Sequence, residues 1–93
     1  MSSTNLNVGG YKQISAATNQ VSVTGSSMIG IFVSAATVTP TITVYDSNVG
    51  ATTTKIVDTF TPVPATFYSL PFSSTSGLYI VLGGTVSATV AFA

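Results

Sequence analysis

The sequence contains no cysteine, histidine, glutamate, arginine or tryptophan. Without cysteine the chain cannot form disulfide bonds or thiolate metal sites. Without histidine, and with only two carboxylates, it lacks most of the groups that enzymes use to transfer protons or to activate a nucleophile. These absences argue against an enzyme, and we expect the protein to need no cofactor and no metal.

Charge is also scarce. Charged residues make up 4% of the chain, the net charge is zero, and the whole supply is Lys12, Asp46, Lys55 and Asp58. A surface with so little charge repulsion promotes association between copies or with partners. No basic cluster is present to bind nucleic acid or an anionic membrane surface, so neither is an expected partner. Hydroxyl groups from 13 Ser and 16 Thr residues supply the polarity instead.

The chain has no long uninterrupted apolar run. Residues 59–93 carry no charge, but they contain three prolines, and their most apolar part, 77–93, is interrupted by Gly83 and Gly84. That part is also shorter than the ~20 residues that a membrane-spanning helix needs. The N-terminus lacks the basic and apolar regions of a secretory signal. We expect one domain over residues 11–93, preceded by a flexible polar arm over residues 1–10.

Apolar residues recur at every second position nearly throughout, which predicts β-strands rather than helices. Turn residues separate the strands about every ten positions, as in a small antiparallel β-sandwich of the jelly-roll or Ig-like kind. The sequence therefore predicts an all-β sandwich of seven or eight short strands. The predicted strands span residues 11–14, 20–24, 28–34, 41–45, 54–60, 66–70, 78–82 and 86–92.

The two carboxylates have structural interpretations. Asp46 begins the turn formed by residues 46–50, so we expect its side chain to cap that turn. Asp58 falls on the inward face of its predicted strand and breaks the apolar pattern there. It could pair with Lys55 or Lys12, bond to a backbone edge, or contact a neighbouring subunit. Residues 46–48 offer three oxygen-bearing side chains but only one carboxylate, which is too few to predict a cation site.

Several large side chains are candidates for a contact with a partner. Tyr45 and Tyr79 lie on strands opposite their inward neighbours, so they are expected at a subunit contact or at a glycan-binding surface. Phe32 and Met28 belong to a strand that is apolar on both faces. Because a two-layer sandwich covers only one face of each sheet, we expect a partner to cover the outer face.

Four segments resemble a family of short tailed-bacteriophage structural proteins, most of them uncharacterised. They are MIGIFVSAA from residue 28, TITVYD from residue 41, TKIVDTFTPV from residue 54 and GLYIVLGGTVSATV from residue 77. Each segment alone is a generic strand, and the resemblance lies in their succession over about two-thirds of the chain. It implies a virion component that is assembled in the host cytoplasm, and it transfers no catalytic residue.

The resemblance favours a capsid decoration protein that binds the major capsid protein and stabilises the head. By analogy with decoration proteins at the threefold positions of icosahedral shells, we expect a homo-oligomer, and a trimer in particular. A module of the neck, tail or fibre is the structural alternative, and copy number in the virion would separate the two. A module that binds host glycans is an alternative from another functional class, and it predicts clustered surface tyrosines.

Overall fold

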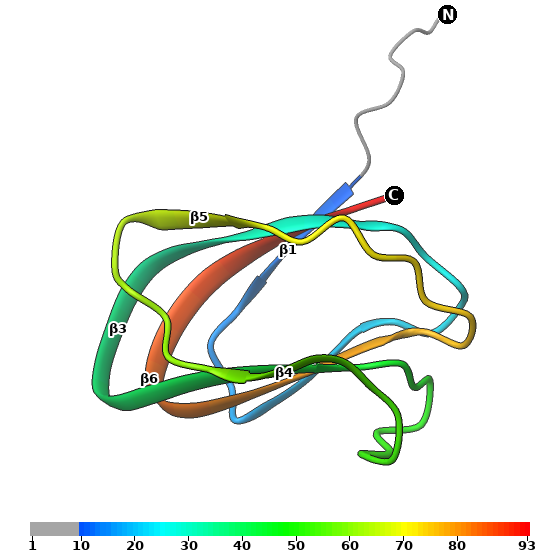
Figure 1. Cartoon of the computed structure of the whole chain (residues 1–93), viewed down its shortest axis with the longest axis horizontal. Coiled ribbons are helices and arrows are strands. Elements are labelled where there is room, and N and C mark those ends of the chain that lie inside the picture. The colour runs from blue at the N-terminus through cyan, green and yellow to red at the C-terminus, as the bar shows by residue number, and fades with distance from the viewer. Residues whose placement is uncertain (1–9) are drawn as a thin grey trace, which may run out of the picture.

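A computed structural model of the chain describes residues 10–93, and these residues form an all-β fold (Figure 1). Six strands join in one antiparallel sheet, and no helix occurs in this part of the chain. The strands are β1 (Gly10–Ile14), β2 (Thr18–Ser22), β3 (Met28–Tyr45), β4 (Lys55–Phe60), β5 (Thr66–Ser69) and β6 (Leu78–Phe92). The expected flexible arm over residues 1–10 lies, except for Gly10, outside the described residues.

Two long strands, β3 and β6, run side by side through the middle of the sheet and bend together (Figure 1). Their pairing shifts register between Thr37 and Thr41, so that residues 38–40 of β3 lie opposite the single residue Gly84 of β6. At this bend Val38 and Gly84 both have positive φ, 60° and 67°. A β-carbon on Gly84 would contact the carbonyl oxygen of Val38 and lie 2.8 Å from that of Thr39. Glycine at position 84 is therefore required both by the backbone conformation and by the close approach of the two strands.

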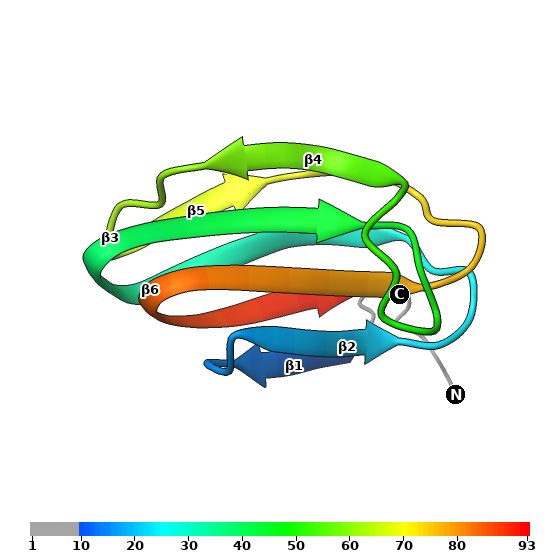
Figure 2. The same ribbon diagram turned by 90° about the horizontal axis from the view of Figure 1, so that it is seen from below.

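The bend doubles the sheet over, and its two halves face each other (Figures 1 and 2). Layer A consists of β5, residues 28–36 of β3, residues 85–92 of β6, and β1. Layer B consists of β4, residues 41–45 of β3, residues 78–83 of β6, and β2. Each layer thus has two central segments from the long strands and two short edge strands.

The hydrophobic core lies between the two layers. Its fully buried side chains are β-branched or leucine residues that point inward from β3 and β6, as the alternation along a strand requires. They are Ile31, Val33, Ile42, Val44, Leu78, Ile80 and Val90. Burial of each such side chain contributes roughly 1.5–3 kcal/mol to folding. Inward side chains of the two long strands therefore hold the layers together.

Aromatic and amide side chains close the two sides of the core. On one side the rings of Phe60 in β4 and Tyr68 in β5 have centroids 5.0 Å apart, which links the edge strands of the two layers. On the other side the Asn19 amide nitrogen donates hydrogen bonds to the carbonyl oxygens of Ala16, at 2.8 Å, and Ile80, at 3.3 Å. The first bond holds the connection between β1 and β2, and the second ties β2 to the central strand β6.

The prediction of an all-β fold is confirmed, but residues 10–93 form six strands rather than seven or eight. Predicted strands 28–34 and 41–45 are one strand, β3, and predicted strands 78–82 and 86–92 are one strand, β6. Pro40 and the Gly83–Gly84 pair suggested strand ends. In the structure they lie where the paired strands bend, and pairing resumes beyond them.

Candidate functional site

Tyr45 and Tyr79, the first candidates for a contact surface, lie side by side on the outer face of layer B. The two residues are paired across β3 and β6, and their ring centroids are 6.3 Å apart with an angle of 45° between the planes. Both are half-buried, and a β-carbon on Gly50 would lie 3.6 Å from the Tyr79 ring. The sequence correctly placed both tyrosines on a face that points away from the core.

The other two candidates, Phe32 and Met28, do not share a face. Phe32 points outward from layer A with 42% of its surface exposed, whereas Met28 is 2% exposed and belongs to the core. A register shift between Met28 and Gly30 reverses the alternation of β3 at this point, so Met28 turns inward and Ile29 outward. Met28 is therefore a core residue, and its expected role in a subunit contact is wrong.

The outer face of layer A carries aromatic side chains and no charge. Register and alternation place two rows of residues across it: Ser69, Gly30, Ala91 and Tyr11 in one row, and Phe67, Phe32, Thr89 and Gln13 in the other. We call these eight residues the layer A face. Phe67 is 52% exposed and Tyr11 is 75% exposed. Phe67 and Tyr11 were not predicted from the sequence as members of this face, because the alternation of residues 66–70 does not show which side of the strand faces the core.

Phe67 does not project freely into solvent, because its ring lies over Gly30. A β-carbon on Gly30 would contact Cζ of Phe67, and it would lie 2.9 Å from Cε1 of the same ring. An aromatic ring that covers a glycine on the neighbouring strand shields the exposed backbone and fixes strand register. The packing leaves about half of the Phe67 surface exposed.

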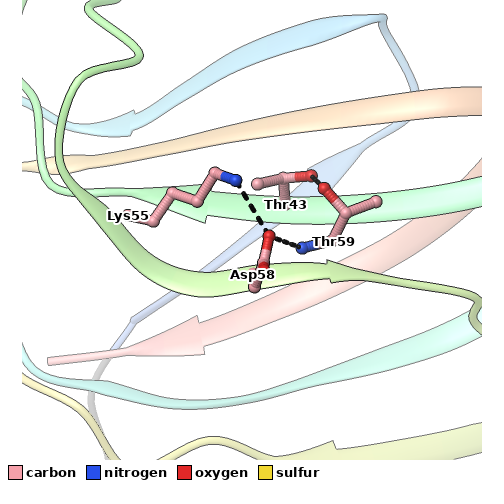
Figure 3. Close-up of polar contacts among 4 residues, drawn as sticks. All are labelled: Thr43, Lys55, Asp58 and Thr59. Atoms are coloured by element: carbon pink, nitrogen blue, oxygen red, sulfur yellow. Dashed lines mark hydrogen bonds and ion pairs between the residues drawn. The ribbon is translucent and has the colours of Figure 1, made fainter.

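A polar cluster occupies β4, the edge strand of layer B (Figure 3). The Lys55 Nζ atom donates a 2.9 Å hydrogen bond to Oδ1 of Asp58, and the backbone N–H of Thr59 donates to the same oxygen at 2.7 Å. The hydroxyl groups of Thr59 and Thr43 are 2.6 Å apart and join β4 to β3. The hydrogen bond between the Lys55 ammonium and the Asp58 carboxylate lowers the pKa of Asp58 and raises that of Lys55.

Asp58 points outward, although the sequence pattern placed it on the inward face. The register between β3 and β4 shifts twice within the six residues of β4, first between Lys55 and Val57 and again between Val57 and Phe60. Each shift is a β-bulge that adds one residue and reverses the alternation. Lys55 and Asp58 consequently reach each other on one side of the strand. The interpretation of Asp58 as a partner of Lys55 is confirmed.

Asp46 holds a loop that is remote in sequence. Its Oδ2 accepts hydrogen bonds from the backbone N–H and the hydroxyl of Thr75, at 3.0 and 2.9 Å, and its Oδ1 accepts from the N–H groups of Ser76, at 2.8 Å, and Gly77, at 3.2 Å. The expectation that Asp46 caps its own turn is wrong. That turn is held by Ser47, whose hydroxyl accepts from the N–H groups of Val49 and Ala51.

These bonds favour the ionised form of Asp46. The backbone N–H of Thr75 makes the largest contribution, followed by that of Ser76, and together the bonds lower the pKa of Asp46 from 3.8 to about 2. A carboxylate that is fixed by four hydrogen bonds and ionised at all ordinary pH values is suited to holding a loop. It is unsuited to accepting and releasing a proton near neutral pH.

Within residues 10–93 the structure contains no pocket and no cluster of three side chains of the kind that binds metals. Asp46 and Asp58 are each hydrogen-bonded to groups in their own surroundings, and no shared site between them is formed. The same part of the chain contains no helix of the length and apolar character required to cross a membrane.

Comparison with known proteins found no matching family model, no matching curated protein and no matching solved structure.

Proposed function

We propose that this protein is a structural component of a bacteriophage virion and has no enzymatic activity. Its most specific role, in this proposal, is that of a capsid decoration protein that binds the major capsid protein and stabilises the head. The succession of the four sequence segments that resemble short phage structural proteins supports the virion assignment. The structural observation that supports it most is the layer A face, where Phe32, Phe67 and Tyr11 form an uncharged surface suited to contact with protein.

The doubled sheet supports a module of the β-sandwich type, either jelly-roll or Ig-like. Two four-stranded layers enclose a single core, with inward side chains from both layers, as in β-sandwiches. The unusual feature in this interpretation is that the central strands β3 and β6 pass from one layer to the other without interruption. Such continuity resists separation of the layers and suits a protein whose role is mechanical reinforcement.

The proposal includes association of several copies. A chain with four charged residues has few means of keeping copies apart, and the uncovered apolar surface needs a partner. A trimer follows from the analogy with threefold sites on shells. The geometry of the described residues supports a shared surface between copies and supplies no argument for three copies over two.

A module of the neck, tail or fibre would use the same surface in fewer copies per particle. A glycan-binding module would use the adjacent Tyr45 and Tyr79, which satisfy its prediction of clustered tyrosines. Their rings, however, are inclined by 45° to each other and therefore offer a sugar no common plane. The geometry thus favours the protein-contact role over the glycan-binding one.

Quantitative mass spectrometry of purified virions tests the proposal. The decoration role predicts that copies of this chain are present in a fixed, high ratio to the major capsid protein and are lost when the head is selectively removed. A ratio matching the few copies of a neck or tail protein would contradict the decoration role. Absence from the particle would contradict the whole proposal.

A further inference from the structure

The corner at which β3 passes from one layer to the other (Figure 2) has a sequence that conflicts with its conformation. Val38 and Thr39 have φ values of 60° and 55°, both in the left-handed region. That region suits glycine and asparagine, and a β-branched residue in it is a steric outlier. Thr39 is strained further because it precedes Pro40, and a residue before proline prefers an extended backbone. The corner therefore holds two consecutive residues in a conformation that both disfavour.

The same stretch of sequence suits a straight strand. Residues 37–44 read TVTPTITV, and seven of the eight are β-branched, the residue type that favours an extended backbone. The opposite strand differs, because β6 turns the corner at Gly84, which accepts its φ of 67° without strain. Burial does not offset the cost in β3, since the Val38 side chain is 74% exposed. The strain of the bend is thus concentrated in β3.

This corner also divides the described chain into two complementary parts. The part before it, residues 10–37, contains β1, β2 and the first half of β3, and the strand pairings of all three are with β5 or β6. Side-chain bonds follow the same division. The Gln20 amide nitrogen donates to the carbonyl oxygens of Ser47 and Leu78, at 2.7 and 3.1 Å. Residues 10–37 are therefore held in place by residues beyond the corner.

We propose that this corner is a hinge about which two copies of the chain exchange residues 10–37. With the hinge extended, β3 runs straight from one doubled sheet to the other, and residues 10–37 of each copy pair with β5 and β6 of its partner. The strand pairings and side-chain bonds of the exchanged segment are the same as in the monomer, so the exchange needs no new complementary surface. Only the hinge differs, because Val38 and Thr39 leave the left-handed region. Short hinges under strain favour this kind of exchange.

The balance between the closed monomer and the exchanged dimer depends on concentration. Closure within one chain is favoured by the high effective concentration of a tethered segment. Relief of strain at two hinges acts in the opposite direction, and each strained position shifts the equilibrium by about tenfold or more. The dimer therefore forms where the chain is concentrated. Reciprocal exchange closes at two copies, so this inference predicts a dimer in place of the trimer suggested by analogy.

Refolding of the full chain from denaturant, at micromolar and at millimolar concentration, followed by size-exclusion chromatography tests the inference. The wild-type chain should give a dimer at the higher concentration, and this dimer should persist on dilution because its return to monomer requires the exchanged segments to separate. Val38→Asn with Thr39→Gly introduces residues that accept the left-handed conformation. This hinge variant should lower the ratio of dimer to monomer by about tenfold or more and raise the Tm of the monomer.

Val49→Asn with Thr52→Gly is the matched control for the hinge variant. It makes the same two exchanges at exposed loop positions, neither of which has a positive φ. No backbone strain is relieved there, so the ratio of dimer to monomer should stay at the wild-type value. An equal loss of dimer in the control and in the hinge variant would show that strain at the corner does not drive association.

A disulfide identifies exchange directly, because the chain has no cysteine of its own. Gln13→Cys with Thr89→Cys places two thiols at facing positions of β1 and β6. Facing residues of antiparallel strands have Cα atoms about 4.5–5.5 Å apart, which is within reach of a disulfide. After oxidation of the separated dimer, exchange predicts two covalently linked chains on a non-reducing gel. The oxidised monomer, which should form the bond within one chain, is the control.

Three results would overturn the inference: a wild-type chain that stays monomeric after refolding at millimolar concentration, an oxidised dimer that runs as single chains, or a dimer yield that the hinge variant leaves unchanged. The experiment uses the isolated chain and does not depend on the proposed virion role. Absence of the chain from purified virions would contradict that role and leave the exchange standing.

Discussion

The Phe67 ring on β5 occupies the space above Gly30 on β3 that any larger residue at position 30 would need. A β-carbon there would lie 2.9 Å from Cε1 of Phe67 and 2.5 Å from the carbonyl oxygen of Tyr68. The ring can rotate away, but the carbonyl belongs to the strand that pairs with β3. The absence of a side chain at position 30 therefore allows β5 to pack this closely against β3.

Gly30→Ala should lower the free energy of unfolding by about 1–3 kcal/mol, the usual cost of inserting a carbon into a tightly packed position. Chemical denaturation monitored by tyrosine fluorescence would measure it. Gly10→Ala is the matched control, since a β-carbon at position 10 meets only Cζ of Phe92, at 4.0 Å. Equal stability of the two variants would mean that Phe67 does not depend on Gly30 for its place.

The bend between the layers gives a second prediction. Gly84 has a φ of 67° and lies against the carbonyl oxygens of β3, so Gly84→Ala imposes both backbone strain and a close contact. Strained positions of this kind cost on the order of 1–3 kcal/mol each. Thermal unfolding should show a clear drop in Tm for Gly84→Ala and little change for Thr85→Ala, the exposed neighbour. An unchanged Tm in Gly84→Ala would contradict the bend as described.

The Asp46 carboxylate predicts a dependence of stability on pH. Its pKa in the folded protein is about 2, below its ordinary value of 3.8. A group whose pKa is lowered by folding stabilises the fold above its ordinary pKa, and this stabilisation is lost as the pH falls through about 4 towards 2. Asp46→Asn removes the ionised group, so the variant should be less stable than wild type at pH 6.

The difference in Tm between wild type and Asp46→Asn should shrink steadily as the pH falls from about 4 to 2. Calorimetry at several pH values would measure it. Asp58→Asn is the comparison, because Asp58 is bound chiefly by the exposed Lys55 side chain rather than by a set of backbone N–H groups. A Tm difference for Asp46→Asn that stays constant over this range would show that the carboxylate charge does not hold the Thr75–Gly77 loop.

The charges of the β4 edge predict an effect on aggregation. Replacing Lys55 and Asp58 together with serine leaves the net charge unchanged but removes both charges from this edge. We expect the double variant to form thioflavin-positive aggregates sooner than wild type at equal concentration. Exchanging the two residues, Lys55→Asp with Asp58→Lys, keeps two charges on the edge and should preserve solubility. If both variants aggregate alike, the edge charges have no protective role.

The alternation of apolar residues was sufficient to predict the all-β class, because segments such as 41–45 follow period two without interruption. It failed where bulges change that period. One shift before Gly30 turned Met28 inward, and two shifts in β4 turned Asp58 outward. A bulge depends on the pairing of two strands, so neither strand's own sequence reveals it.

Long-range contacts were equally hidden from the sequence. The Asp46 carboxylate accepts hydrogen bonds from residues 75–77, which lie 29 to 31 positions further along the chain. Local turn preferences had instead favoured a bond within its own turn. The outer face of layer A became visible only when strand order placed β5, β3, β6 and β1 side by side. Tyr45 and Tyr79 were located correctly because each lies next to an inward residue in an uninterrupted stretch.

Electron cryomicroscopy of the phage particle that carries this chain tests the central claim most directly. The account predicts density for the doubled six-stranded sheet at many equivalent positions on the outer surface of the head, in contact with the major capsid protein and with an apolar sheet face covered by protein. A head surface without this density, in a particle shown by mass spectrometry to contain the chain, would contradict the account.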